Sequence, residues 1–184
     1  MDKRNRPALG FLLAGVGLAG RALMGVPQAS SIAELTLGAL MLIGYLVLVQ
    51  QVRLPVFFCA ASLALELYLC GTGLDTAALS TVLLRQADLW FAYDAATLTL
   101  RCAKTLCPEL YGRRSGTVPV VALVLLAVQS LAQLGAALLP QYPALPMAGM
   151  ALFVAFSVVM LGYTLLFIRA YNALRIKKEN RRQL

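Results

Sequence analysis

The sequence contains no histidine, and only 13% of its 184 residues are charged. Histidine is the commonest general base and the commonest transition-metal ligand, so its absence removes both and excludes His-dependent catalytic triads and cysteine peptidases. A soluble domain is usually about 25% charged. Because 60% of the residues are hydrophobic and the mean hydropathy is +0.78, the sequence predicts an integral membrane protein.

The sequence also lacks a CxxC pair. Its four cysteines are Cys59, Cys70, Cys102 and Cys107. Free cysteine behaves as a small buried hydrophobe, and a spacing of five places Cys102 and Cys107 on different faces of a helix. We therefore expect four packing residues, with no metal, no cofactor and no catalytic cysteine. Long apolar runs fill the chain and leave no room for a nucleic-acid-binding module.

Six apolar runs predict the fold. We expect an all-α membrane protein with six transmembrane helices arranged as three hairpins in a single transmembrane domain, 1–184. The expected helices are 8–26, 32–50, 54–70, 79–100, 117–139 and 147–169. A cytoplasmic loop, 101–116, and a basic C-terminal tail, 170–184, complete the chain. A basic start before an apolar run is also typical of a signal peptide, but we expect a retained first helix.

The segment 79–100 decides this topology because it carries Arg85, Asp88 and Asp94. Each charge at the centre of a membrane helix adds about 2.5 to 3.5 kcal/mol to insertion. The alternative is a helix lying in the membrane interface, which requires polar and apolar residues on opposite faces. They are instead scattered around the helix. We therefore predict a membrane-spanning helix that is shielded by its neighbours.

The positive charges predict the orientation. Of sixteen Lys and Arg residues, fourteen lie in the two chain ends, the turn at Arg53 or the loop 101–116. Arg21 and Arg85 are the other two, and they lie within expected helices. Basic residues concentrate on the cytoplasmic side of a membrane, so six spans with both termini cytoplasmic satisfy this rule in the cell membrane. Five spans would place one strongly basic end outside.

Polar side chains from five expected helices occur at overlapping depths, estimated at 1.5 Å per residue. The candidate substrate-binding or ion-pair cluster comprises Arg21, Glu34, Glu66, Arg85, Asp88, Gln129 and Gln133. Ionisable groups in lipid usually face a bundle interior, pair with one another or line a wet cavity. We predict that this set lines a polar cleft opening outward. A second, inner stripe contains Trp90, Asp94 and Thr97. Trp90 either packs in the core or stacks against a ligand, and Asp94, below the outer acids, suggests a route for protons.

Three functions fit these features. The leading hypothesis is binding or translocation of a small solute through the cleft, either alone or as the membrane subunit of a larger transporter. The alternative is a structural or assembly subunit whose intramembrane charges only pair helices. An intramembrane lipid-modifying enzyme is the third, disfavoured because no nucleophile with an adjacent base can be identified. Expected partners are the lipid bilayer, anionic lipid headgroups at the inner face, and a second copy or another membrane subunit contacting the glycine-rich first helix, but no nucleic acid.

Overall fold

The computed structural model describes residues 6–24, 32–49, 53–72, 78–111 and 116–182. The fold of these residues is all-α and contains six long helices, which confirms this part of the prediction. In chain order the elements are α1 (Arg6–Met24), α2 (Ile32–Leu48), α3 (Leu54–Thr72), α4 (Leu79–Leu106), the short 3-10 helix η2 (Pro108–Leu110), α5 (Thr117–Leu138) and α6 (Ala144–Arg182).

Two helices extend well beyond the ranges that the sequence pattern predicts. α4 continues through 101–106 and ends just before Pro108, because proline disfavours helical backbone in the residue before it. α6 begins at Ala144, with Pro146 in its first turn, and continues to Arg182. The segment 170–182 contains neither glycine nor proline and is rich in residues with high helix propensity. The basic tail expected at 170–184 is therefore a continuation of α6 over its described part.

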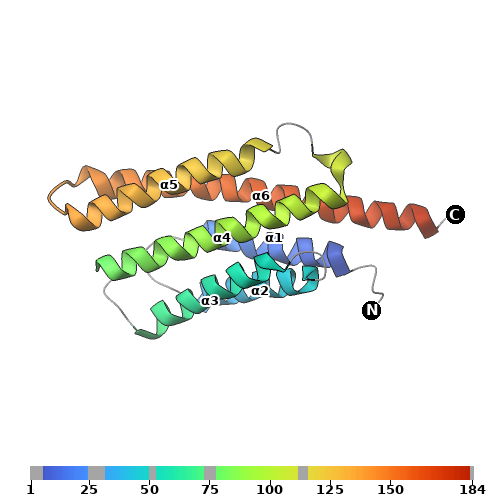
Figure 1. The fold of residues 1–184 in the computed structure, drawn as a ribbon, viewed down its shortest axis with the longest axis horizontal. Helices are drawn as coiled ribbons and strands as arrows, with labels where there is room; N and C mark the ends of the chain where they lie inside the picture. The colour runs from blue at the N-terminus through green and yellow to red at the C-terminus, as the bar shows by residue number, and fades with distance from the viewer. Residues whose placement is uncertain (1–5, 25–31, 50–52, 73–77, 112–115, 183–184) are drawn as a thin grey trace.

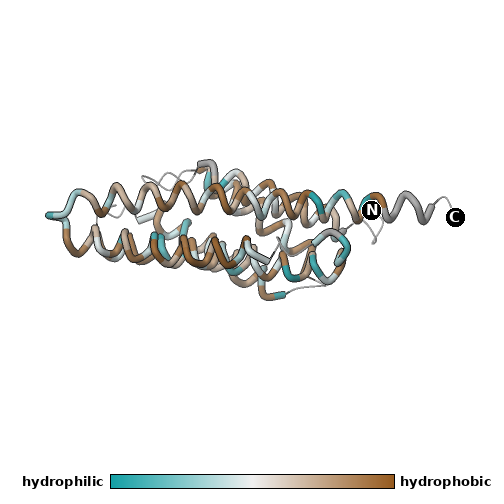
Figure 2. The backbone as a smooth tube through the Cα atoms, turned by 90° about the horizontal axis from the view of Figure 1, so that it is seen from above, coloured by the Kyte–Doolittle hydropathy of each residue, from teal (hydrophilic) through white to brown (hydrophobic). Residues whose placement is uncertain are grey.

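Three segments are long and apolar enough to cross a membrane: Leu54–Thr72, Thr117–Leu138 and Ala144–Ile176. Pro7–Ala22 and Ile32–Leu48 are shorter apolar helices. α4 is not among the three, although it has 28 residues, because charged side chains recur along its length. Large apolar side chains such as Phe57, Leu131 and Val158 are more than 60% exposed, as expected for a surface that faces lipid. Figure 2 shows hydrophobic residues throughout the length of the bundle. These features indicate a multi-pass membrane protein.

The helices run roughly along the long axis of the molecule (Figure 1). α1 packs against α2 and α6, whereas α4 packs against α3, α5 and α6. α4 therefore lies between the α5–α6 pair and α3, and its charged residues have neighbouring helices on more than one side. The start of α1 and the end of α6 lie at one end of the bundle, and the turn between α5 and α6 lies at the other.

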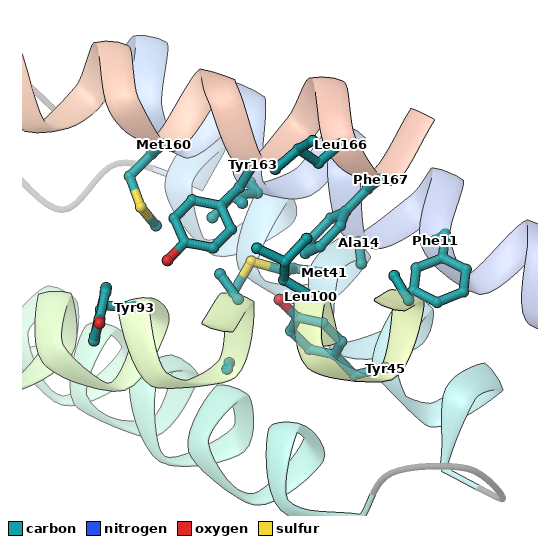
Figure 3. Close-up of a cluster of buried hydrophobic side chains, with 14 of the residues drawn as sticks. Phe11, Ala14, Met41, Tyr45, Tyr93, Leu100, Met160, Tyr163, Leu166 and Phe167 are labelled. Atoms are coloured by element: carbon teal, nitrogen blue, oxygen red, sulfur yellow. The ribbon is translucent and has the colours of Figure 1, made fainter. Parts of the chain in front are cut away.

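Aromatic side chains from several helices lie together in the buried core (Figure 3). The rings of Phe11 on α1 and Phe167 on α6 have centroids 6.1 Å apart, and Tyr163 packs edge-on against Phe167. The hydroxyl groups of Tyr163 and Thr97 share a hydrogen bond of 2.8 Å, which joins α6 to α4. Tyr45 of α2 is fully buried in the same cluster. The core thus holds α1, α2, α4 and α6 in fixed positions.

Glycines bring the backbones of α1 and α2 unusually close. A side-chain carbon added at Gly17 would lie 2.8 Å from the carbonyl oxygen of Leu37, and one added at Gly44 would overlap the backbone of Ala14. Gly15 instead faces Phe167 on α6. Close contacts between small residues are a common source of helix association in lipid. The described glycines of α1 therefore contact helices of the same chain.

Candidate functional site

Arg21, Glu66 and Asp88 meet inside the bundle. Arg21 lies in the last turn of α1, Glu66 lies six residues before the end of α3, and Asp88 lies nine residues after the start of α4. α1 and α3 end, and α4 begins, at the same end of the molecule (Figure 1). The up-and-down order of the helices therefore brings three residues that are far apart in the sequence to one depth.

The Arg21 guanidinium group bonds to two other helices at once. Its Nη2 donates to Asp88 Oδ2 at 2.7 Å and also to Glu66 Oε1, while its Nη1 donates to Ser62 Oγ at 2.8 Å. Ser62 Oγ in turn donates to Asp88 Oδ1. Several donors in a fixed planar geometry suit arginine to such multiple pairing. We refer to Arg21, Ser62, Glu66 and Asp88 as the charge cluster.

The charge cluster is nearly closed to solvent and carries more acid than base. The side chains of Arg21, Glu66 and Asp88 are 11%, 7% and 12% exposed. Two carboxyl groups face one guanidinium group, so full ionisation of all three would leave one uncompensated negative charge. An uncompensated charge in a region of low dielectric is strongly unfavourable. Within the cluster itself, a proton or a bound cation would balance that charge.

Glu66 has one oxygen that the cluster does not use. Its Oε2 is buried and accepts no hydrogen bond, whereas both oxygens of Asp88 accept one. A carbon added at Gly38 on α2 would lie 3.0 Å from this Oε2, so the missing side chain of Gly38 leaves space beside it. Glu34, one turn earlier on α2, interacts electrostatically with Glu66. Oε2 thus faces α2 and an acidic neighbour.

The two glutamines of the predicted set lie on α5. Gln129 is 2% exposed and its Oε1 has no hydrogen-bond partner, while the side chain of Gln133 lies beside Gly149 on α6. The neighbouring Ser130 donates to Gln86 Oε1 at 2.9 Å and joins α5 to α4. These contacts form an uncharged polar region between α4, α5 and α6. No hydrogen bond described for them reaches the charge cluster.

The members of the predicted inner stripe have different partners. Trp90 Nε1 donates to Ser130 Oγ at 3.3 Å, and its ring packs edge-on against Tyr93. Thr97 bonds to Tyr163 on α6, as described above, and Asp94 is half-buried. Trp90 therefore faces α5 and Thr97 faces α6. This arrangement suits helix packing in two directions.

Two residues important to the site are absent from the sequence-based set. Ser62 bonds to both Arg21 and Asp88, and Gly38 makes room for Glu66. The signal for Ser62 is its spacing of four from Glu66, which puts both on one face of a helix.

Arg85 is half-buried one turn before Asp88 on α4. Among the described residues, no three His, Cys, Asp or Glu side chains are placed to hold a metal ion.

Comparison of the chain with protein-family models, with curated proteins and with solved structures finds no match. The function is therefore inferred from the chemistry of the charge cluster and its surroundings.

Proposed function

We propose that the chain is a six-span membrane protein that binds or translocates a small cationic solute at the charge cluster. The observation that carries this proposal is the excess of buried acid, with two carboxyl groups for one guanidinium group. A cation that replaces the missing positive charge makes the buried site neutral. The excess acid therefore favours a cationic solute over an anionic one.

The proposed route to the site is from the end of the bundle at which α1 ends and α4 begins. Arg21 is three residues from the end of α1, and the three charged side chains retain between 7% and 12% exposure. At this low exposure the site is nearly closed to solvent, so the proposal requires the helix ends around it to separate before a solute can enter. Figure 1 shows that this end lies opposite the end of α6. The proposed cleft thus opens on the side away from the basic segments.

The proposed orientation places that opening outside the cell. The start of α1, the start of α3, the end of α4 and the end of α6 all lie at the other end of the bundle, where Arg6, Arg53, Arg101 and Arg169 occur. Basic residues favour the cytoplasmic side. In this orientation α4 is the fourth of six spans, both termini are cytoplasmic, and the basic end of α6 lies near anionic headgroups.

A screen for ligand-induced stabilisation tests the proposal. Purified protein is heated with small organic amines, quaternary ammonium compounds and alkali cations, and with neutral analogues of the organic compounds. A cation that binds only the folded state raises the melting temperature, and the rise grows with the logarithm of its concentration once that concentration exceeds its Kd. We expect at least one organic cation to stabilise the wild type, its neutral analogue to have no effect, and Glu66→Gln to abolish the response. Glu109→Gln, at an exposed acid on η2, is the matched control and should retain it.

Two results would overturn the proposal. The first is that no cation stabilises the wild type more than it stabilises Glu66→Gln and Asp88→Asn. The second is that neutral analogues stabilise the protein equally well. Either result would show that the excess acid does not select a cationic solute.

A structural role is the second candidate, favoured by the number of bonds that Arg21 makes. Arg21 contacts Ser62 and Glu66 on α3 and Asp88 on α4, so it ties three helices together. Replacing a buried ion pair and its partners with apolar residues of similar size is often neutral for stability. Arg21→Met combined with Glu66→Met and Asp88→Leu separates the two functions. The structural role predicts that no cation stabilises either the wild type or a folded triple variant, whereas the solute-binding role predicts that a cation stabilises the wild type alone.

A further inference from the structure

We propose that Glu66 is a proton-binding site within the membrane: Oε2 carries an exchangeable proton, which a bound cation displaces. The exchange deepens the proposed function and rests on it, whereas the presence of the proton follows from the geometry of the charge cluster alone.

The charge balance of the cluster requires one proton when no cation is bound. With Arg21 charged and both acids ionised, the net charge of the buried group is negative. Burial of a group with a net charge is far less favourable than burial of a neutral group. One of the two acids therefore binds a proton, while the other remains the counterion of Arg21. Two acids that share a site differ in protonation for the same reason.

Hydrogen bonding identifies which acid carries the proton. Asp88 accepts from Arg21 at Oδ2 and from Ser62 at Oδ1, and hydrogen bonds of this kind stabilise the ionised form. Glu66 accepts from Arg21 at Oε1, and its Oε2 accepts nothing. Glu66 is only 5% exposed, so water does not supply the hydrogen-bond donor that Oε2 lacks. Oε2 of Glu66 is therefore the oxygen that holds the proton.

The surroundings of Glu66 favour this assignment. Arg21 faces it from α1, Glu34 from α2, Cys59 from its own helix and Asp88 from α4. Glu34 and Asp88 are acids, and both disfavour a negative charge on Glu66. Gly38 leaves space beside Oε2, where a larger residue would place a carbon 3.0 Å away. A proton fits that space, and a small cationic group can replace the proton after a modest movement of α2.

The exchange step is balanced without any further reactant. A solute with one positive charge enters, the O–H bond at Oε2 breaks, and the electron pair remains on Glu66 as a carboxylate. The proton leaves to water at the end of the bundle where α1 ends and α4 begins. The net charge of the occupied site stays the same, so one proton is released for each monovalent cation bound.

Infrared spectroscopy of the intact purified protein tests the presence of the proton. A buried protonated carboxyl group gives a C=O stretching band that an ionised carboxylate lacks. We expect this band in the wild type, and we expect it to shift when the protein contains glutamate with a heavy carbon isotope in the side-chain carboxyl. Labelled aspartate should leave the band unchanged. Because this measurement uses the wild type, it does not depend on whether any variant folds.

Variants identify the carboxyl group among the glutamates. Glu34→Gln should retain the band, and Glu66→Gln should lose it. Asp88→Asn should also lose it although Glu66 is present, because Glu66 then becomes the sole counterion of Arg21. The proposal is overturned if the wild type lacks the band, if labelled aspartate shifts it, or if it persists in Glu66→Gln.

Proton release on binding tests the exchange separately. A cation from the stabilisation screen is added to weakly buffered protein, and the pH is followed. We expect about one proton per cation bound in the wild type, by the charge balance above, and none in Glu66→Gln. Binding without proton release would overturn the exchange but leave the proposed solute-binding function standing. A wild type that shows the glutamate band but binds no cation would refute the solute-binding function instead.

Discussion

Replacement of Arg21 by methionine is the perturbation with the largest expected effect on stability. Methionine has a similar length and no charge, so it keeps the packing of α1 while removing every polar contact of the guanidinium group. Ser62, Glu66 and Asp88 would each lose a partner at a site where the charged side chains are 12% exposed or less. Two buried acids would then face each other without a cation.

The lost contacts set a lower and an upper limit for the loss in the free energy of unfolding. Hydrogen bonds within membrane proteins average about 0.6 kcal/mol, so the loss of three sets a lower value of about 2 kcal/mol. Removal of one partner from a buried ion pair costs about 3 to 5 kcal/mol, which sets the upper value. Protonation of the acid that Arg21 had neutralised would relieve part of the cost at low pH. We therefore expect a loss of about 2 to 5 kcal/mol at neutral pH and a smaller loss in acid.

Reversible unfolding of the purified protein in mixed micelles measures this loss. Arg101→Met is the matched control, since it removes an exposed arginine from α4 and should change the free energy of unfolding by about 0.5 kcal/mol or less. Circular dichroism establishes that both variants remain helical before unfolding. Equal effects of Arg21→Met and Arg101→Met would refute the conclusion that the charge cluster holds the helices together. A loss at Arg21 that did not diminish in acid would refute the role assigned to the two carboxyl groups.

Two further predictions concern the packing of the helices. Gly44→Ala should destabilise the protein by about 1 to 3 kcal/mol, because the added carbon would overlap the backbone of Ala14 and backbone cannot move aside as a side chain can. Gly71→Ala, at a glycine with no atom within 4 Å of the added carbon, should have little effect, and equal unfolding free energies for the two variants would contradict the close approach of α1 and α2. The hydrogen bond between Thr97 and Tyr163 should give a coupling energy of about 0.6 to 1.7 kcal/mol in a double-mutant cycle with Thr97→Val and Tyr163→Phe. Strict additivity of the two single substitutions would show that the bond does not join α4 to α6.

The sequence predicts the number and type of the helices because the apolar runs are long and separated by proline, glycine or charge. It predicts their ends less well. α6 continues to Arg182 because residues after the apolar run still favour helix, and hydropathy does not register this. In the same way, the loop expected at 101–116 begins as the last turns of α4.

For the site, the sequence predicts only the depth of each residue along its helix. Position along each helix places Arg21, Glu66 and Asp88 at similar depths, and the structure shows that they are bonded. The direction in which a side chain points cannot be obtained in this way, because lipid and protein interior are both apolar and the hydrophobic pattern does not separate them. Gln129 and Gln133 share the predicted depth, yet they lie on α5 in a separate polar region. The hydropathy pattern does not indicate Ser62, because a serine adds little to the free energy of inserting a helix into the membrane.

The proposed six-span arrangement requires α4 to cross the membrane, because α4 carries Asp88 to its partners on α1 and α3. Thr76 and Ser115 flank α4 in the sequence, and a variant without the four native cysteines accepts a single new cysteine at either position. We predict that a membrane-impermeant thiol reagent labels Thr76→Cys in intact cells and labels Ser115→Cys only after the cells are opened. Labelling of both positions from the same side of the membrane would contradict the six-span arrangement and the outward-facing site.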